Sequence, residues 1–148
     1  MKPLSLNVFA ERLSAVMPVM CKSMVRYEQN ALTKGEVSLP QFWAMSWLSD
    51  HTGATMHDLA KAMNLKPSTA TMLVDRLVEL KMMDRDRDGV DRRRVLVRLS
   101  ARGRKILDEV YSQKQKALQE TFRHLSPAER LQYLELIEKL ADRLEETL

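Results

Sequence analysis

The feature that most constrains the fold of this chain is a pair of short helical patterns joined by a tight turn. A strand pattern follows directly after the pair. The first helical pattern covers Thr55–Asn64, and the second covers Pro67 to about Lys81. Proline suits the first turn of a helix, where its missing N–H would have no helical partner. Met82–Leu99 then predicts two strands, with Asp88-Gly89 as the hairpin turn. The pattern therefore predicts a pair of helices with a small antiparallel hairpin beside it.

Longer helical patterns flank this central part on both sides. Apolar residues recur at spacings of three and four from Leu6 to Tyr27, and this first helix is expected to end near Gly35. Ser38 predicts the start of the next helix through a capping box. After the hairpin, Ser100 and the motif Ser126-Pro127-Ala128-Glu129 predict the starts of two more helices. With only 4 Gly and 5 Pro in 148 residues, the chain is predicted to be mainly α with a small β-hairpin wing.

Composition indicates one globular domain, residues 1–148, that does not cross a membrane. The hydrophobic fraction of 45% argues against disorder, and no apolar run approaches the roughly 18 residues of a membrane span. Glu11 and Arg12 interrupt the segment where a signal peptide would need an apolar core, and a single cysteine, Cys21, excludes an internal disulfide framework. We therefore expect a cytoplasmic protein without a membrane partner. The net charge of +4 is compatible with nucleic acid but does not establish it.

The second helix of the central pair begins with small hydroxyl side chains. Ser68, Thr69 and Thr71 can approach DNA closely and bond phosphates or base edges. The N–H groups and the dipole at the start of this helix also favour a phosphate. A helical hairpin with an ordinary capped helix explains the pattern equally well, so the pair by itself leaves both alternatives open.

The predicted hairpin carries a second signal, a run of arginines directly after its turn. Arg92, Arg93 and Arg94 follow Asp91, whose carboxylate can hold an arginine fork in place. The alternative is a solvated hairpin in which the arginines pair with neighbouring aspartates. An arginine-bearing hairpin tip is the shape that enters a minor groove of DNA. Because a hairpin directly after a helix-turn-helix makes a winged helix, the two signals together predict a DNA-binding lobe over residues 37–99.

The segment from Asp91 to Gly103 resembles the wing signature of the multiple-antibiotic-resistance regulator (MarR) family. In that signature an Asp-x-Arg tip precedes an apolar strand that ends in Leu-Thr/Ser-x-x-Gly. Residues 60–77 resemble the family's helix-turn-helix without gaps, and residues 39–42 resemble the start of its second helix. The resemblance covers nearly the whole chain, and the order of the elements agrees.

The resemblance implies a homodimeric transcription regulator, most simply a repressor, with double-stranded DNA as its partner. Residues 1–36 and 100–148 would be dimerisation helices that interleave with those of the second copy. Each lobe would then bind half of a pseudo-palindromic operator, with the recognition helices roughly 34 Å apart. The predicted DNA-binding residues are Lys66, Ser68, Thr69, Thr71, Met72, Arg76, Asp91, Arg92, Arg93 and Arg94.

Two positions depart from the family's pattern. Met72 stands where relatives often carry a basic residue, and Lys81 replaces the glycine that usually follows the recognition helix. A lysine in a left-handed conformation would cost of order 1 kcal/mol. We therefore expect the recognition helix to end differently in this chain.

The methionine and tryptophan content indicates an adaptable apolar surface. The chain has 10 Met, whose flexible and polarizable side chains suit varied ligands. Packing in the core or at a dimer interface is the simpler explanation. Many relatives bind phenolic or lipophilic effectors between the first, second and fifth helices, so the resemblance implies a similar small effector that releases the DNA. The candidate residues are Met17, Met20, Met24, Tyr27, Trp43, Trp47 and Tyr111.

Other chemistries are not favoured. The sequence has neither a glycine-rich phosphate loop nor a nucleophile elbow, so no enzyme is predicted. His51, His57 and His124 lack the spacing of a metal-binding pair, and we predict neither a metal nor a cofactor. One branch of the family senses peroxides through a first-helix cysteine, but a buried small apolar side chain is the favoured interpretation of Cys21. The alternative function is a helical dimer that acts through protein contacts without binding DNA.

Overall fold

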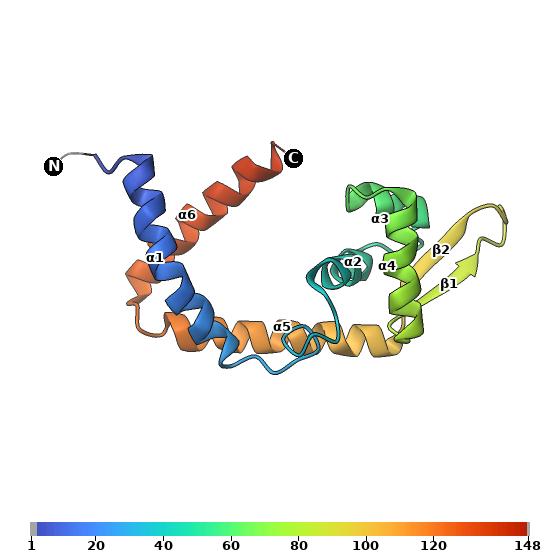
Figure 1. Cartoon of the computed structure of the whole chain (residues 1–148), viewed down its shortest axis with the longest axis horizontal. Helices are drawn as coiled ribbons and strands as arrows, with labels where there is room; N and C mark the ends of the chain where they lie inside the picture. The colour runs from blue at the N-terminus through green and yellow to red at the C-terminus, as the bar shows by residue number, and fades with distance from the viewer. Residues whose placement is uncertain (1–2, 148) are drawn as a thin grey trace. The chain divides into compact units, whose positions relative to one another are not determined.

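The computed structural model describes residues 3–147, so the predicted domain ends at residues 1, 2 and 148 lie outside it. The described residues form six α-helices and one two-stranded antiparallel sheet (Figure 1). The predicted fold class, mainly α with a small hairpin wing, is confirmed. In chain order the elements are α1 Leu6–Val25, α2 Leu39–Asp50, α3 Met56–Ala62, α4 Pro67–Glu79, β1 Met83–Arg87, β2 Val95–Leu99, α5 Ala101–Phe122 and α6 Pro127–Glu145.

The chain divides into two compact units, which are described separately. The first unit, residues 28–113, contains α2, α3, α4, the hairpin and the first part of α5. The second unit consists of the residues before 28 and after 113, and it contains α1, the rest of α5 and α6.

Caps made by side chains set the starts of α2, α3, α5 and α6, and those of Ser38, Ser100 and Ser126 agree with the sequence prediction. In α2, α3 and α6 the capping residue accepts a hydrogen bond from the third helical N–H, and the third side chain bonds back to the N–H of the cap. Each pair satisfies two backbone donors that have no partner within the helix. Ser100 caps α5 in a similar way, since its hydroxyl accepts from the Gly103 N–H at 3.0 Å. The three reciprocal pairs are Ser38 with Gln41, Thr55 with Asp58 and Ser126 with Glu129.

The ends of α3 and α4 share one backbone motif. Asn64 and Lys81 have φ angles of 50° and 58°, in the left-handed region. After α4, the Lys81 N–H donates to the Val78 carbonyl at 2.9 Å and the Met82 N–H donates to the Leu77 carbonyl at 2.8 Å. These two bonds define the Schellman motif.

The expectation that α4 would end differently because of Lys81 is therefore wrong. Lys81 adopts the conformation that a glycine would take there, with φ 58°. The residue that follows it, Met82, is 1% exposed. The two hydrogen bonds of the motif and the burial of Met82 outweigh a backbone cost of about 1 kcal/mol.

Lys81→Gly is expected to raise the free energy of unfolding by about 0.5 kcal/mol. The substitution removes left-handed strain of about 1 kcal/mol, and the greater freedom of glycine in the unfolded chain offsets part of this gain. Chemical denaturation of both proteins measures the difference. As a matched control, Lys105→Gly within helix α5 should lower the free energy of unfolding by about 1 kcal/mol. A loss of stability in Lys81→Gly would contradict the strain at this position.

The first helix is shorter than predicted. α1 ends at Val25 rather than near Gly35, and the residues after it form turns. The side chain of Asn30, which is 1% exposed, accepts from two backbone N–H groups of the following turn. Gln113 of α5 holds the same segment, because its Oε1 accepts from the Gln29 N–H at 2.7 Å and from Asn30 Nδ2 at 3.1 Å. These bonds offer the backbone an alternative to the helix.

The hydrophobic core lies in the unit of residues 28–113. The segment before α3 joins the hairpin, because Thr55 forms a bridge with Leu96 and the Ala54 carbonyl accepts from the Val97 N–H at 2.9 Å. The helix-turn-helix and the hairpin thus form one packed lobe. The largest fully buried apolar side chains of the unit 28–113 are Met45, Leu59, Val74, Leu77, Met82, Met83, Val97 and Val110.

In the other unit, α1 and α6 expose their apolar side chains. Neither helix has a buried residue, and every residue within their bounds is described. A helix of a water-soluble protein normally covers its apolar stripe. Within residues 3–147, no helix has the length and apolar character to cross a membrane. The exposed large apolar side chains of the two helices include Leu6, Phe9, Leu13, Val16, Val19, Leu131, Leu134, Leu136, Ile137, Leu140 and Leu144.

Candidate nucleic-acid interface

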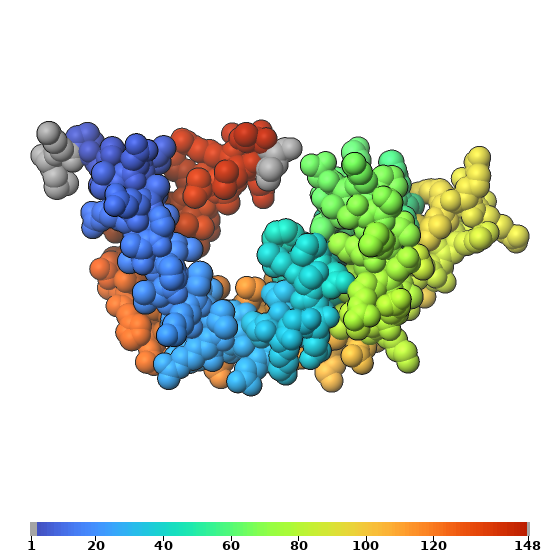
Figure 2. All heavy atoms as spheres, viewed as in Figure 1, coloured from blue at the N-terminus to red at the C-terminus, as the bar shows by residue number. Residues whose placement is uncertain are grey.

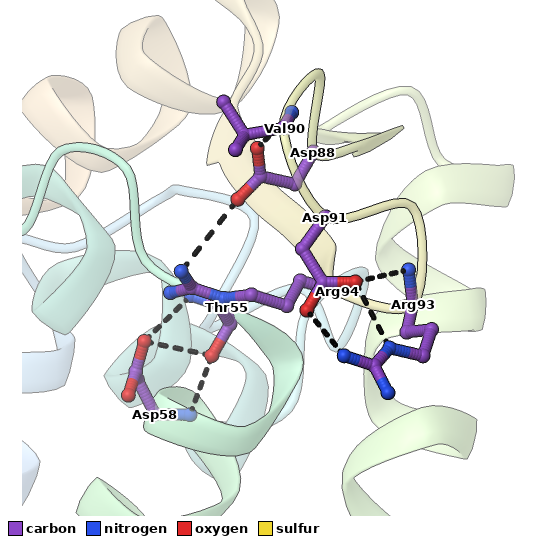
Figure 3. Close-up of polar contacts among 7 residues, drawn as sticks. All are labelled: Thr55, Asp58, Asp88, Val90, Asp91, Arg93 and Arg94. Carbon is purple, nitrogen blue, oxygen red and sulfur yellow. Dashed lines mark hydrogen bonds and ion pairs between the residues drawn. The ribbon is translucent and has the colours of Figure 1, made fainter.

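The hairpin ends in a seven-residue loop, residues 88–94, between β1 and β2. The strands pair from Met83 opposite Leu99 to Arg87 opposite Val95. The predicted hairpin is present, and Asp88-Gly89 lies at the start of this longer loop rather than forming the turn by itself. The Asp88 N–H donates to the Arg94 carbonyl at 3.0 Å and closes the wider loop, and the Asp88 carboxylate accepts from the Val90 N–H at 2.9 Å (Figure 3). This side-chain bond replaces the backbone turn that the sequence predicted.

Asp91 holds the guanidinium of Arg93 in a two-point contact. Arg93 Nε donates to Asp91 Oδ1 at 3.1 Å, and Arg93 Nη2 donates to Oδ2 at 3.3 Å (Figure 3). Oδ1 also accepts from the Arg93 backbone N–H at 3.1 Å. The Arg93 side chain nevertheless remains 92% exposed, and its neighbour Arg92 is also exposed. A guanidinium bonded to a carboxylate at two points is fixed in orientation as well as stabilised. The loop therefore presents one arginine in a defined orientation.

Two other arginines of the hairpin, Arg94 and Arg98, pair with aspartates of the same hairpin. Arg94 Nη1 lies 3.6 Å from Asp88 Oδ2 across the loop. Arg98 of β2 lies 3.7 Å from Asp84 and 3.0 Å from Asp86 of β1. The alternative of a hairpin with salt bridges thus describes Arg94 and Arg98, whereas Arg93, although paired with Asp91, projects from the loop.

The predicted recognition-helix residues share the exposed face of α4. The opposite face of α4 is buried through Ala70, Val74 and Leu77. Lys66 precedes the helix as its N-cap and makes no side-chain capping bond, which leaves the first N–H groups available to a phosphate. Figure 2 shows α4, in green, on the surface, and the yellow hairpin loop projecting from the same lobe. The exposed residues are Lys66, Ser68, Thr69, Thr71, Met72 and Arg76.

Several polar groups of α4 already have partners that the sequence did not predict. The Thr71 hydroxyl donates to the Pro67 carbonyl at 2.9 Å. Arg76 Nη1 donates to Glu79 Oε2 at 3.1 Å, one turn further on. Spacings of four and three residues within a helix allow both contacts. Asp75 also forms an ion pair at 2.6 Å with Arg85 of β1, which only the tertiary structure brings close.

Hydrogen bonds lower the pKa of two carboxyl groups in this lobe. For Asp91, the Arg93 side chain is the main cause, the Arg93 backbone N–H adds to it, and the charge of Arg94 contributes a little. For Asp58 the pKa falls chiefly because the side chain and then the backbone of Thr55 donate to the carboxylate. In both cases the hydrogen bonds favour the ionised form.

Arg93→Ala is expected to raise the pKa of Asp91 back towards its ordinary value of 3.8. Because the folded-state pKa is lowered, the contribution of Asp91 to stability is complete above the unfolded-state pKa. It is lost as the pH falls through the lower folded-state pKa. Carbon-13 NMR titration of the carboxyl groups measures both values. The pKa of Asp58 serves as the internal control and should stay lowered, while an unmoved Asp91 pKa would argue against the two-point contact.

The predicted effector residues are distributed over both units. Within the lobe, Trp43 and Trp47 of α2 line an open groove of about 530 Å³ together with Met63. Tyr111 instead packs its ring against Phe42, with the ring centroids 5.5 Å apart, and its hydroxyl bonds to Ser46. Around α1, Met20 and Met24 are half-buried, and Met17 and Tyr27 are exposed.

Cys21 is exposed on α1, so the expectation of a buried side chain is wrong for the single chain. Its place on a helix without buried residues explains the difference. Among residues 3–147, no group of three His, Cys, Asp or Glu side chains is arranged to hold a metal ion.

Comparisons with known proteins agree with this geometry. The MarR family model matches residues 37–95, which contain the recognition helix and the wing loop. YsmB of Bacillus subtilis strain 168, named as an uncharacterized HTH-type transcriptional regulator, is 32% identical over 98 residues, which are 66% of this chain and 67% of YsmB.

Solved structures share the fold over most of the chain. The crystal structure of Rv1404 from Mycobacterium tuberculosis superposes with a TM-score of 0.81 at 23% identity and covers 96% of both chains. BpsR of Bordetella bronchiseptica, whose DNA binding is regulated by 6-hydroxynicotinic acid, has a TM-score of 0.58 at 26% identity, over 88% of this chain and 98% of BpsR. The recognition helix, the wing and these matches lead to one conclusion: the chain belongs to the MarR family of DNA-binding winged helix-turn-helix transcriptional regulators.

Proposed function

We propose that the chain is a homodimeric repressor that binds a pseudo-palindromic operator and is released by a small effector. The observation that carries the dimer is the absence of any buried residue along α1 and α6, both of which lie within the described part of the chain. Leu6 is 78% exposed and Leu136 is 67% exposed. Apolar surfaces of this extent mark protein interfaces.

A second copy of the chain is the proposed partner of these helices. Oligomers of soluble proteins are mostly symmetric and use the same surface on both subunits. In this proposal residues 1–36 and 100–148 form the dimerisation helices. The apolar stripes of α1 and α6 would then be covered by the same stripes of the second copy.

In the proposed complex α4 enters the major groove and the loop 88–94 reaches an adjacent minor groove. The major groove of B-DNA admits an α-helix, and residues at the start of a recognition helix contact base edges. Ser68, Thr69 and Met72 lie at that end of α4. Arg93, held by Asp91, suits the minor groove, where the negative potential is focused. The basic side chains of Lys66, Arg76, Arg92 and Arg94 would contact phosphates.

The effector is proposed to be a small lipophilic or phenolic molecule. The groove beside Trp43 and Trp47 offers aromatic surface within the lobe, and the regulation of BpsR by an aromatic acid supports the same class of ligand. An effector releases DNA only if it binds one conformation of the dimer more tightly than the other. Loss of the operator-competent conformation would relieve repression.

Sedimentation velocity tests the dimer. The chain is expected to sediment as a dimer at micromolar concentration, and Ile137→Glu is expected to give monomers because it places a charge in the apolar stripe of α6, on a different side of the helix from Gln132. Gln132→Glu adds the same charge to the same helix at an exposed polar position, and it should leave the dimer intact. A monomeric parent chain would refute the proposed assembly.

Fluorescence anisotropy tests the DNA complex. Sequences selected from a random duplex library should bind at nanomolar protein in about 150 mM salt, with one dimer per site. Affinity should fall steeply as the salt concentration rises, because phosphate contacts release counterions. The alternative of a dimer that acts only through protein contacts predicts weak binding that is equal on all sequences.

A further inference from the structure

We propose that the recognition helix reads thymine through the methyl group of the base, with Met72 as the side chain that contacts it. This inference rests on the proposed function, because it assumes that α4 lies in the major groove. It adds the chemistry by which that helix distinguishes one base from another.

Met72 is an apolar side chain on the most exposed line of α4. It is 73% exposed, whereas Met45, Met82 and Met83 of the same lobe are at most 1% exposed. Helical spacing places Met72 one turn after Ser68 and one turn before Arg76, on the face opposite the buried Ala70 and Leu77. The core of the lobe therefore does not account for an apolar residue at this position.

The polar groups around Met72 have limited capacity to read bases. The Thr71 hydroxyl proton is used in the bond to the Pro67 carbonyl. Arg76 is paired with Glu79 at 3.1 Å, and Asp75 is paired with Arg85 at 2.6 Å. Two hydroxyl groups, those of Ser68 and Thr69, precede Met72 on the helix. No glutamine, asparagine or second arginine lies between Pro67 and Glu79 to make a two-point contact with a purine.

The major groove presents one apolar group, the C5-methyl of thymine. A flexible thioether side chain adapts its shape to such a group. Removing a methyl group from a buried apolar contact weakens binding about fourfold. With one such contact in each half-site of a dimer, the loss is about 15-fold.

The test compares one DNA sequence with and without its thymine methyl groups. A consensus duplex is first selected from a random library with the full-length protein. The same duplex is then synthesised with deoxyuridine in place of every thymidine of the two half-sites, which removes the methyl groups and keeps the base pairing. Fluorescence anisotropy gives the affinity ratio of the two duplexes for the parent chain, for Met72→Ala and for Arg93→Ala. Thermal melting checks that the exposed Met72 position tolerates truncation.

The parent chain is expected to bind the thymidine duplex about 15-fold more tightly than the deoxyuridine duplex. Met72→Ala should reduce this ratio to below about twofold, because the contact is gone. Arg93→Ala should weaken binding to both duplexes and keep the ratio, since the wing does not contact the methyl group.

Three results would overturn the proposal: a consensus without thymine in its half-sites, equal affinity of the parent chain for both duplexes, or an unchanged ratio in Met72→Ala. A selection that yields no consensus would instead refute the sequence-specific binding proposed above, and the thymine contact with it.

Discussion

Arg93→Ala is expected to weaken binding to an operator duplex by about 1–3 kcal/mol, or roughly 5-fold to 150-fold. Arg93 is 92% exposed, and Asp91 holds its guanidinium by two hydrogen bonds, at 3.1 and 3.3 Å. The arginine is thus oriented before DNA binds, and little additional ordering is needed to place it in a groove. Fluorescence anisotropy at fixed salt concentration measures the change.

Two further variants separate orientation from charge. Arg93→Lys keeps the positive charge but loses the planar fork, so it should recover only part of the affinity. Arg98→Ala removes an arginine that is paired with Asp84 and Asp86 within the hairpin strands, and its effect on affinity should be much smaller. Equal losses for Arg93→Ala and Arg98→Ala would mean that total charge, rather than the oriented side chain, determines the contribution of the wing.

Gly103→Ala is expected to lower the free energy of unfolding by roughly 3 kcal/mol, at the upper end of the cost of overpacking. A Cβ atom on Gly103 would lie 2.0 Å from the Met82 carbonyl oxygen and 2.9 Å from its carbon. The Met82 carbonyl is held in place, since it accepts from the Ser100 N–H at 3.1 Å. The clash is therefore between a Cβ atom fixed rigidly to the backbone of α5 and a backbone carbonyl, so α5 would have to shift away from the base of the wing.

Gly89→Ala is the matched control. Gly89 lies in the hairpin loop, and a Cβ there would have no atom within 4 Å. This variant is expected to change the free energy of unfolding by less than about 0.5 kcal/mol. Chemical denaturation of both variants measures the difference. Comparable stabilities for Gly103→Ala and the parent chain would contradict the close packing of α5 on Met82.

The glycine at 103 also gives a physical reason for part of the family signature. The sequence pattern places Ser100 and Gly103 at the end of the second wing strand. In the structure Ser100 caps α5 and its hydroxyl donates to the Lys81 carbonyl at 2.7 Å. Gly103 allows the first turn of α5 to approach Met82. Together the two residues join the end of α4, the start of the wing and the start of α5.

Much of the fold could be predicted because its signals are local. The capping box of Ser38 and Gln41, for example, operates within four residues and fixes where α2 begins. The hydroxyl side chains at the start of α4 and the resemblance to the MarR family identified residues that the structure leaves exposed on this helix. The Asp91–Arg93 pair is separated by one residue, so its contact followed from the sequence as well.

The predictions from the sequence are wrong where a contact with a distant residue decides the local conformation. They are also wrong where a side-chain hydrogen bond competes with the expected backbone structure. The turn after α1 depends on Gln113, which is 84 residues from Gln29. The wing loop is wider than predicted because the Asp88 carboxylate bonds to the Val90 N–H and the loop closes only at Arg94. Propensity rules rank glycine above lysine at a left-handed position, but the hydrogen bonds that end α4 and the burial of Met82 hold Lys81 in that conformation despite its cost.

The sequence by itself determined the order of the elements, their capped starts and the placement of hydroxyl and arginine side chains on the recognition helix and the wing. The tertiary structure decided which of those side chains bond to other residues of the chain and which remain exposed to a partner. Thr71 and Arg76 are bonded within α4, Asp75 is paired with Arg85, and Arg93 projects from the loop. The physical reason is the range of the interactions. Caps and helical faces depend on neighbours within one turn, whereas exposure and ion pairing depend on how separate elements pack.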